Sequence, residues 1–441
     1  MIHPRSRPRL HFTFTACSII LALWAWSSAV QAEPLVLLAT YEGVINPVAA
    51  EYLHDALATA QESHAQALIV RLDTPGGLDT SMRLIVKDIT SATVPVIVYV
   101  SPSGGRAASA GVFITLAAHI AVMASGTNIG AAHPVAIGGG ETDKTMKEKL
   151  ENDFAAYIKS IATQRGRNVA WAEEAVRKSV SVTEREALKL KIIDLIADDV
   201  PALLQQLEGR NVGLQNGQVV LHTAGAVVRD YPMSIRLELL KAISDPNIAY
   251  LLMTIGTIGL MAELYNPGAI LPGVVGAISL ILAFYAFQSV PVNYAGMLLF
   301  LLGIVFFILE ATVTSFGLLT IGGIISMILG SVMLIKTDVE FLRISWSVII
   351  PVVALAAGFS LLIVGMGVRV MRKPPVTGRE GMIGLVGTVK SALGPYGQLA
   401  VRGELWEAIG DQPLQPGDEA EVTRVDGLRL YVKPVPRRKE V

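Results

Sequence analysis

The chain has 441 residues, of which 52% are hydrophobic and 17% are charged, with a formal net charge of −1. A soluble domain usually carries about 25% charged residues, so this composition indicates a protein with a large membrane-embedded part. The near-zero net charge excludes binding to nucleic acid through a global basic field. The lone cysteine, Cys17, excludes a disulfide framework or a cysteine metal site within the chain.

The N-terminus has the pattern of a secretory signal peptide. Arginines stand at positions 5, 7 and 9, a short apolar run follows at 16–26, and small residues lead up to Ala32. This order is typical of a signal that is cleaved after export. We therefore expect residues 1–32 to be removed and the chain that follows to lie outside the cytoplasm, with an uncleaved anchor helix as the alternative.

Residues 33–225 are predicted to form a soluble α/β domain. Apolar runs that suit buried parallel strands alternate with helical patterns, the order expected of crossover units. Thr183 and Glu186 have the spacing of a capping box. A helix followed by a polar connector at 226–246 ends this part of the chain. The expected strands are 35–39, 67–72, 94–100 and 119–124, and the expected helices are 48–62, 78–91, 107–118 and 143–165.

Residues 247–372 form a predicted membrane domain. Pro and Gly between the first two apolar segments permit a re-entrant pair, so four or five spans are both open. Three cations directly after the last segment, Arg369, Arg372 and Lys373, favour a cytoplasmic C-terminus. An exported N-terminal domain and a cytoplasmic C-terminus together require an odd number of crossings, so five spans are preferred. The apolar segments lie at about 248–265, 270–287, 294–312, 317–335 and 347–370.

Two carboxylates, Glu263 and Glu310, stand inside or at the ends of these apolar segments. We interpret them as interfacial or helix–helix polar contacts, with a functional intramembrane carboxylate as the alternative. The last part of the chain, 373–441, has short alternating runs broken by Gly and Pro, which suits a five-stranded barrel of OB type. It lacks a basic run with interleaved aromatics, so a structural or interaction role is favoured over nucleic-acid binding.

Two glycine-rich turns carry the candidate chemistry. Asp73-Thr74-Pro75-Gly76-Gly77 follows the strand at 67–72, and its glycines permit a sharp turn whose N–H groups can cradle an oxyanion. Ser109 lies among small residues at the start of the expected 107–118 helix, where the helix dipole favours a developing alkoxide. Each signal is weak alone, because most Gly-Gly pairs are turns and most serines at helix starts cap or pack.

A serine nucleophile needs a base. A lysine can serve when burial lowers its pKa, and helical periodicity does not choose among the lysines of the 143–165 helix. A Ser109/His133/Asp73 triad is the competing arrangement. No metal-ligand or nucleotide-binding motif is apparent, so no cofactor is expected. The candidate lysines are Lys144, Lys147, Lys149 and Lys159.

The motifs DTPGG, SPSGGRAASAGVFI, GTNIGAAHP and NDFAAYIKSIATQRGRN, in this order, resemble the NfeD family in its long form. Its members are membrane-bound serine proteases of the ClpP class, often encoded beside a stomatin-like protein. The resemblance covers nearly the whole mature chain, including the C-terminal GELWEA and LQPGDEAEV. It implies an α/β ClpP/crotonase-like protease domain, a multi-span α-helical membrane domain and a small all-β OB-like barrel.

The resemblance also implies the site residues. Ser109 matches the nucleophile of the ASAG motif, Gly76 and Gly77 match the turn that supplies oxyanion donors, and Ala110 provides a second N–H. The catalytic lysine of the family precedes the segment that matches FAAYIKS, which assigns it to Lys149.

Lys147 and Lys144 stay open as the base, and a Ser-Lys dyad needs no aspartate. The sequence departs from the family at Lys191, where relatives often have glycine before an apolar pair and an acidic residue, so the end of the helix near 190 is left open.

The resemblance implies an ATP-independent serine endopeptidase that cleaves apolar segments of membrane-associated proteins such as a stomatin-like partner. It would lie in a bacterial-type inner membrane with a cytoplasmic barrel; a homo-oligomer stays open. A non-catalytic scaffold for a stomatin-like protein is the alternative. Acyl-CoA chemistry on a crotonase fold is disfavoured by secretion, since CoA is cytosolic.

Overall fold

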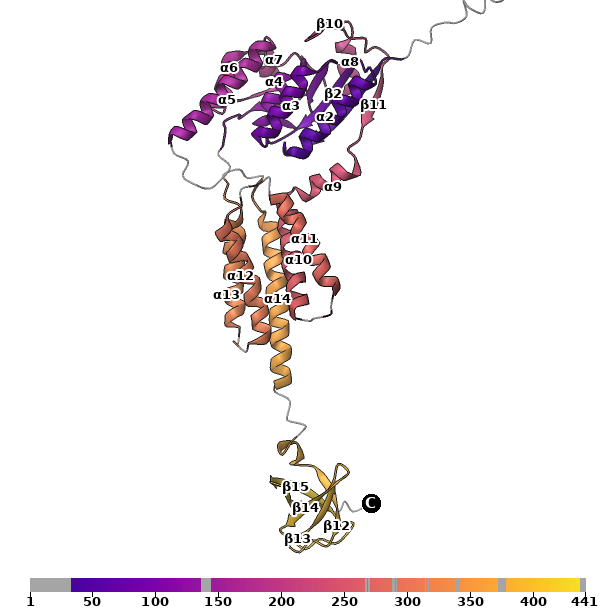
Figure 1. The fold of residues 1–441 in the computed structure, drawn as a ribbon, viewed down its shortest axis with the longest axis vertical. Coiled ribbons are helices and arrows are strands. Elements are labelled where there is room, and N and C mark those ends of the chain that lie inside the picture. Colours follow the sequence, from indigo (N-terminus) through magenta and orange to yellow (C-terminus); the bar gives the residue numbers. More distant parts are fainter. Residues whose placement is uncertain are drawn as a thin grey trace, which may run out of the picture. The chain divides into compact units, whose positions relative to one another are not determined.

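The computed structural model describes residues 33–135, 144–265, 268, 270–287, 290, 292–313, 315, 317–337, 342–371 and 378–436 (Figure 1). The signal peptide predicted at 1–32 lies outside these residues. The described chain forms an α/β domain, a set of apolar helices and a C-terminal barrel.

The N-terminal domain is built on a six-stranded sheet in which all neighbouring strands are parallel, in the order β11-β1-β2-β3-β5-β8. The four strands expected from the apolar runs are confirmed as β1, β2, β3 and β5, and one further strand lies at each edge. The strands are β1 (Leu35–Glu42), β2 (Ala67–Asp73), β3 (Val96–Val100), β5 (Ile120–Met123), β8 (Leu195–Ile196) and β11 (Val227–Tyr231).

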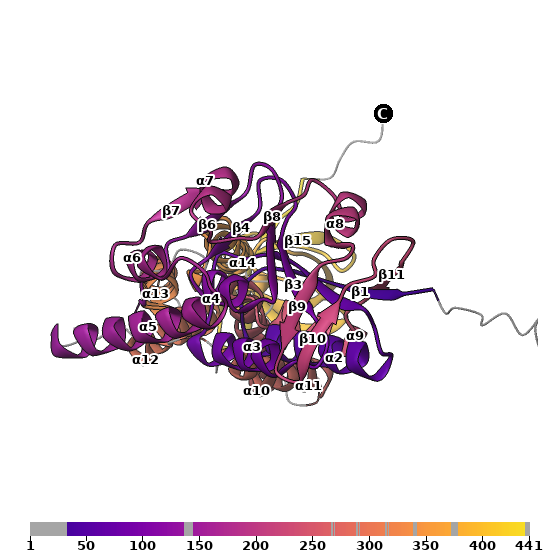
Figure 2. The same cartoon turned by 90° about the horizontal axis from the view of Figure 1, so that it is seen from above.

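Both faces of this sheet are buried, which explains why its central strands are continuous apolar runs. Leu37 and Tyr41 of β1 belong to the core on one face, and Val36 and Leu38 belong to the core on the other. Helices cover the two faces as seen from above (Figure 2). They are α2 (Pro47–Glu62), α3 (Asp79–Ser91) and α4 (Ala110–Ala117) on the first face and α8 (Val200–Leu207) on the second.

A second, three-stranded sheet has the order β4-β6-β7, with β4 (Arg106–Ala108), β6 (Asn128–Gly130) and β7 (Ser181–Thr183). The helix expected at 107–118 is therefore shorter, because its first residues pair with β6 as a strand and α4 begins at Ala110. The remaining helices here are α5 (Lys144–Gln164), α6 (Val169–Arg177) and α7 (Glu184–Lys189). The capping box of Thr183 and Glu186 is confirmed at the start of α7.

The chain after α8 contains more regular structure than expected, both at the end of the predicted 33–225 domain and in the connector predicted at 226–246. β9 (Asn211–Leu214) and β10 (Gly217–Val220) form a hairpin, and β11 then pairs with β1 at the sheet edge. α9 (Ile235–Ile243) follows and buries Leu237 in the domain core. Residues up to 243 thus belong to the α/β domain. The largely exposed side chains of β11 explain why its sequence looks polar, as edge strands often do.

The predicted membrane block contains five apolar helices within the described residues. Three of them, α10, α11 and α14, contain a stretch long and apolar enough to cross a bilayer, and the other two are shorter. These candidate spans agree with a membrane protein, while the number of five crossings stays a prediction. The helices are α10 (Pro246–Tyr265), α11 (Ile270–Phe287), α12 (Tyr294–Thr312), α13 (Leu318–Leu334) and α14 (Trp346–Met371).

Glycines allow α10 and α11 to approach closely. A Cβ added at Gly276 would lie 2.7 Å from the backbone N of Leu260 and 2.8 Å from the carbonyl O of Gly256. A Cβ at Gly259 would lie 2.5 Å from the carbonyl O of Pro272. Small residues at such contacts are the usual basis of helix packing in membranes.

Glu310 lies near the end of α12 and is buried. Its carboxylate accepts hydrogen bonds from Ser315 Oγ at 2.6 Å, from the Gly317 N–H at 2.9 Å and from the Thr320 N–H at 3.0 Å. It therefore satisfies N–H groups at the start of α13, which agrees with the interpretation of Glu310 as a polar contact between helices.

The C-terminal domain is a closed five-stranded barrel with the order β12-β13-β14-β16-β15. β14 and β16 are parallel, and the other pairs are antiparallel. This is the 1-2-3-5-4 strand order of an OB fold, so the predicted OB-like barrel is confirmed. The strands are β12 (Val386–Ser391), β13 (Tyr396–Val401), β14 (Glu404–Gly410), β15 (Glu419–Asp426) and β16 (Arg429–Pro434).

Candidate active site

The turn after β2 brings the Gly76–Gly77 backbone against Ser109. Gly76 has a φ of +124°, which side chains rarely adopt, and a Cβ there would lie 2.7 Å from Ser109 Cβ and 3.2 Å from Ser109 Oγ. A Cβ at Gly77 would lie 2.1 Å from the carbonyl O of Ile45. Contact with Ser109 therefore excludes a side chain at position 76, and contact with the chain after β1 excludes one at position 77.

Ser109 occupies a sharp turn between β4 and α4, with φ 52° and ψ −113°. Such backbone costs about 1–3 kcal/mol in a residue other than glycine and is found mainly at functional sites. The Ser109 N–H donates to the carbonyl O of Gly130 at 3.1 Å, which holds the turn. Ser109 is the N-cap of α4, yet its side chain makes no capping bond. The hydroxyl is therefore not a helix cap.

Two backbone N–H groups beside Ser109 are candidate oxyanion donors. In the β-bridge between Ile45 and Gly77, the Ile45 N–H donates to the Gly76 carbonyl and the Ile45 carbonyl accepts the Leu78 N–H. The Gly77 N–H takes no part in this bridge. Ala110 begins α4, and the first N–H groups of a helix have no partner within the helix. The N–H of Gly76, in contrast, donates to Thr74 Oγ1 at 3.0 Å.

Thr74 is a residue of this site that sequence analysis did not single out. Its side chain is fully buried, and its Oγ1 accepts from the Gly76 N–H and donates to the Gly76 carbonyl at 3.1 Å. Its backbone N–H donates to Arg106 O at 2.8 Å, and its carbonyl accepts from the Ala108 N–H at 3.0 Å. Thr74 thus bonds both to the glycine turn and to the strand before Ser109. The sequence signal for this contact was a threonine two residues before a glycine, a spacing at which the hydroxyl can accept the glycine N–H within a turn.

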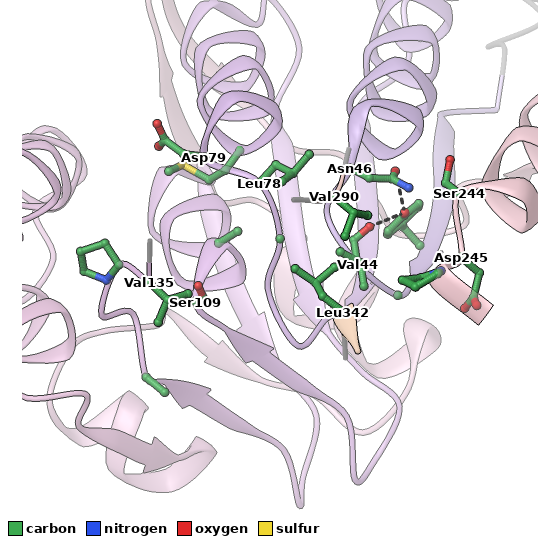
Figure 3. Close-up of a pocket in the computed structure, with 18 of the residues that line it drawn as sticks. Val44, Asn46, Leu78, Asp79, Ser109, Val135, Ser244, Asp245, Val290 and Leu342 are labelled. Atoms are coloured by element: carbon green, nitrogen blue, oxygen red, sulfur yellow. Dashed lines mark hydrogen bonds between the residues drawn. The ribbon is translucent and has the colours of Figure 1, made fainter. Parts of the chain in front are cut away.

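A cavity of about 370 Å³ lies beside Ser109. Figure 3 shows Ser109 and Val135 on one side of it and Val44 and Asp245 on the other. Its apolar lining suits an apolar side chain of a ligand. That lining includes Leu78, Met82, Val135, Phe154, Pro246, Val290 and Leu342.

Tyr41 and Lys241 form part of the same lining. Tyr41 donates its hydroxyl proton to the carbonyl O of Val44 at 2.7 Å, and burial raises the pKa of this phenol above its ordinary value. Lys241 Nζ lies 4.9 Å from the centre of the Tyr41 ring, within the range of a cation–π contact. The Tyr41 phenol therefore stays protonated at neutral pH, and it shapes one wall of the cavity.

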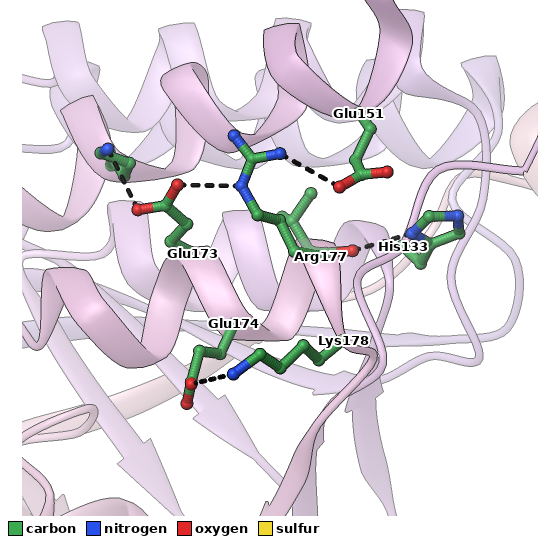
Figure 4. Close-up of polar contacts among 8 residues, drawn as sticks. His133, Glu151, Glu173, Glu174, Arg177 and Lys178 are labelled. Carbon is green, nitrogen blue, oxygen red and sulfur yellow. Dashed lines mark hydrogen bonds and ion pairs between the residues drawn. The ribbon is translucent and has the colours of Figure 1, made fainter. Parts of the chain in front are cut away.

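His133 lines the same cavity as Ser109. Its Nδ1 lies 2.9 Å from the carbonyl O of Val176 (Figure 4). A carbonyl can only accept, so Nδ1 carries the proton, and Nε2 carries the lone pair when the ring is neutral. The Val176 carbonyl occupies the ring nitrogen that the aspartate of a triad would orient, and Asp73 instead accepts the N–H of Arg106 at 2.9 Å. The triad of Ser109, His133 and Asp73 is therefore not assembled in this form.

Lys149 lies in the second turn of α5, exposed and outside the cavity lining. Two ion pairs hold α5 in place just after Lys149 along the helix. Glu151 pairs with Arg177 at 3.1 Å (Figure 4), and Asp153 pairs with Arg83 at 2.5 Å.

The other candidate lysines are also outside the cavity lining. Lys144 and Lys147 are exposed, and Lys159 pairs with Glu173 at 3.0 Å. Among the described residues, the structure thus brings Gly76, Gly77 and Ala110 to Ser109, whereas the lysines of α5 stay outside the cavity lining.

The fold and the site together define a class of protein. An N-terminal α/β domain that carries Ser109 is followed by apolar helices and an OB-type barrel. Family models match each part: "NfeD1b, N-terminal domain" over 36–209, "NfeD integral membrane domain" over 247–366, and "NfeD-like C-terminal, partner-binding domain" over 379–434. The chain belongs to the NfeD family, as its motifs indicated.

Two curated relatives match most of the chain. The membrane-bound protease PH1510 of Pyrococcus horikoshii is 38% identical over 429 residues, which cover 94% of this chain and 96% of the relative. The membrane protein NfeD1b of Bacillus subtilis is 27% identical over 405 residues, which cover 88% of this chain and 90% of the relative.

Among solved structures, the N-terminal region is similar to the 1510-N membrane protease, specific for a stomatin homolog, from Pyrococcus horikoshii. The identity is 35% and the TM-score is 0.43, with 48% of this chain and all of that chain covered.

Proposed function

We propose that this protein is a membrane-bound serine endopeptidase with Ser109 as its nucleophile. The observation that carries the proposal is the turn at Ser109. Its backbone is left-handed, its hydroxyl is not a helix cap, and its side chain faces Gly76 beside an apolar cavity. The relative named a membrane-bound protease, 38% identical over nearly the whole chain, supports the same chemistry here.

The oxyanion of the tetrahedral intermediate would be held by the N–H groups of Gly77 and Ala110. Gly76 contributes the close approach to Ser109, while its own N–H is bonded to Thr74. A single donor of this kind is typically worth about 3 kcal/mol of transition-state stabilisation. The glycine turn and the first N–H of α4 would thus act as one oxyanion site.

Lys149 is the proposed general base, as the family resemblance implies. Its neutral Nζ would take the proton of Ser109 Oγ while the oxygen attacks the peptide carbonyl carbon. The ammonium would return that proton to the leaving amine, and water would then hydrolyse the acyl-enzyme. Phe154, five residues or about 7.5 Å further along α5, already lines the cavity. The proposal therefore includes an approach of the first turns of α5 to a bound substrate.

His133 is the competing base. It lines the cavity, and its Nδ1–H bond to Val176 O leaves the lone pair on Nε2. A backbone carbonyl would then replace the carboxylate that orients the histidine in a Ser-His-Asp triad. The two arrangements predict opposite results for single replacements of His133 and Lys149.

The proposed substrates are apolar segments of membrane-associated proteins, such as a stomatin-like partner. The solved N-terminal relative is described as specific for a stomatin homolog. The apolar lining of the cavity beside Ser109 suits such segments. No nucleotide-binding motif is apparent in the sequence, so the proposed cleavage is independent of ATP. An exported protease domain and a cytoplasmic barrel complete the proposal.

Cleavage of an apolar peptide and labelling by a fluorophosphonate test this function in the full chain in lipid nanodiscs. Ser109→Ala should abolish both, and Ser103→Ala, an exposed serine in the loop before β4, should change neither. Lys149→Ala should lower kcat more than 100-fold, and Lys147→Ala should leave it within twofold. Cleavage that survives in Ser109→Ala would refute the proposed nucleophile.

The base is tested in the same assay. A loss confined to His133→Gln, with full activity in Lys149→Ala, would assign the base to His133. The alternative function, a scaffold for a stomatin-like protein, is supported by the partner-binding description of the C-terminal family model. A scaffold predicts no fluorophosphonate labelling and normal partner capture in Ser109→Ala.

A further inference from the structure

The short helix α9 joins the α/β domain to the first candidate span (Figure 1). Its two sides differ in character. Leu237 is buried in the domain core. Arg236 pairs with Glu51 of α2, and Lys241 lies over the ring of Tyr41. These contacts fix α9 to the same domain that carries Ser109.

The other side of α9 is apolar and uncovered within the described part of the chain. The side chains of Ile235 and Leu239 are 77% and 59% exposed, and Ala242 is exposed as well. Positions i, i+4 and i+7 lie along one face of a helix. A continuous apolar stripe is rare on a surface that faces only water, so we expect something other than water to cover this face of α9.

Chain continuity decides what covers this face. α9 ends at Ile243, and α10 begins at Pro246. Three residues reach at most about 10 Å, so the end of α9 lies within that distance of the start of a candidate span. Asp245 accepts the N–H of Asn247 at 2.8 Å and caps α10, which ties the junction together.

A second marker places the same junction at a membrane surface. Asn247 Oδ1 accepts the backbone N–H of Ser345 at 2.8 Å, which joins the start of α10 to the start of α14. The next residue, Trp346, is 56% exposed. Tryptophan is enriched at the boundary between water and lipid. The starts of both helices therefore lie at one level, with an aromatic side chain suited to that boundary.

We propose that α9 is a membrane-surface helix whose Ile235–Leu239–Ala242 face lies in the interfacial layer of the bilayer. An amphipathic helix binds there by burying its apolar face. Arg236 and Lys241, which contact Glu51 and Tyr41, keep the other side of α9 on the α/β domain. The same element contributes Lys241 to the cavity beside Ser109, and the following Ser244, Asp245 and Pro246 line it too. α9 thus holds this cavity at the lipid surface.

The consequence for substrates rests on the proposed function. A cavity that ends at the first residues of α10 is reached by a chain segment that has just left the bilayer. The preferred scissile bond should therefore lie within a few residues of the end of a substrate's own span. Soluble apolar peptides would be cleaved without this advantage.

A spin label tests the position of α9 in the full chain, reconstituted in vesicles of phosphatidylethanolamine and phosphatidylglycerol. Cys17→Ser removes the lone cysteine, and Leu239→Cys places the label on the apolar face. Lys178→Cys, an exposed position after α6, is the control. The label at 239 should be relaxed several-fold more by dissolved oxygen than by a water-soluble nickel chelate, with the order reversed at 178.

Equal access of the nickel chelate to both labels would overturn the proposal. A label at 239 shielded from both reagents would also overturn it, because the face would then be covered by protein, either a partner or a second copy. These outcomes do not depend on catalysis, so failure of the proposed protease activity leaves this measurement decisive.

A double variant tests the consequence for substrates. Ile235→Glu/Leu239→Glu should lower cleavage of a single-span substrate with a site next to its span about tenfold, and should leave cleavage of a soluble peptide within twofold. An equal loss for both substrates would indicate a folding defect and contradict this role of α9. Ser109→Ala identifies the cleavage that depends on the proposed nucleophile.

Discussion

The hydroxyl of Thr74 bonds to both backbone polar groups of Gly76, accepting its N–H at 3.0 Å and donating to its carbonyl at 3.1 Å. The same threonine pairs through its backbone with Arg106 and Ala108, just before Ser109. Its Cγ2 would lie 2.6 Å from a Cβ at Gly111, so it also packs against α4. One buried side chain therefore sets the separation between the glycine turn and the serine.

Thr74→Val should lower kcat for peptide cleavage about 10- to 100-fold with KM within threefold. Valine keeps the shape of threonine but removes the hydroxyl. The Gly76 N–H then loses its partner and the Gly76 carbonyl keeps only the Ile45 N–H, so the turn is held less firmly against Ser109. Losing one oxyanion donor outright typically costs about 3 kcal/mol in the transition state and little in the ground state, and a misplaced donor loses part of that. Steady-state kinetics in nanodiscs would measure the separation of the two constants.

Two further variants distinguish positioning from packing. Thr74→Ser keeps the hydroxyl and should recover most of kcat. Thr115→Val removes a hydroxyl from another fully buried threonine, whose Oγ1 donates to the Gly111 carbonyl within α4 at 2.7 Å. It should leave kcat within threefold. Equal losses in both valine variants would assign the effect to general destabilisation.

The sequence predicted the parts of this molecule that depend on local pattern. Apolar runs located β1, β2, β3 and β5, and the capping box located α7, because burial and capping leave direct traces in the chain. β11 was missed because an edge strand has exposed side chains. At the site, motif order identified Ser109 and the glycine turn. Thr74 was missed because its role arises from a contact between two turns 35 residues apart, Thr74 and Ser109.

Lys191→Gly should stabilise the N-terminal domain by about 1 kcal/mol. Lys191 follows α7 with φ 58°, a left-handed conformation that costs a residue with a side chain about 1–2 kcal/mol and glycine almost nothing. Its N–H donates to Leu188 O at 3.1 Å, which the replacement keeps. Thermal unfolding of the purified chain would measure the gain. Lys189→Gly, inside α7, should instead lose about 1 kcal/mol.

Stability should fall as pH is lowered from about 7 toward 4, partly through His119. Burial, with help from Arg165 and Arg167, lowers the pKa of His119 to about 3. In the unfolded chain the ordinary value is about 6.5. Between these values the unfolded state binds a proton that the folded state does not, so acid favours unfolding.

His119→Asn should make this decline shallower between pH 7 and 5 in thermal unfolding. Asparagine can accept the Val96 N–H that His119 Nδ1 accepts at 3.2 Å, and it does not titrate. His64→Asn, at an exposed position, should leave the slope unchanged. An unaltered slope in His119→Asn would remove this histidine from the acid response.

Glu310→Gln should destabilise the turn between α12 and α13 by about 1–3 kcal/mol. The carboxylate accepts hydrogen bonds at both oxygens, from Ser315 and Thr320 at one and from Gly317 at the other. Glutamine has a single accepting oxygen, so its amide group would face at least one N–H that is then left unpaired in a buried setting. Unfolding of the full chain in mixed micelles by added SDS would measure the loss.

Glu263→Gln, at a partly exposed position near the end of α10, should change the midpoint little. A Glu310→Gln midpoint equal to that of the parent would mean that solvent or lipid headgroups satisfy these donors, and that the carboxylate is retained for another reason.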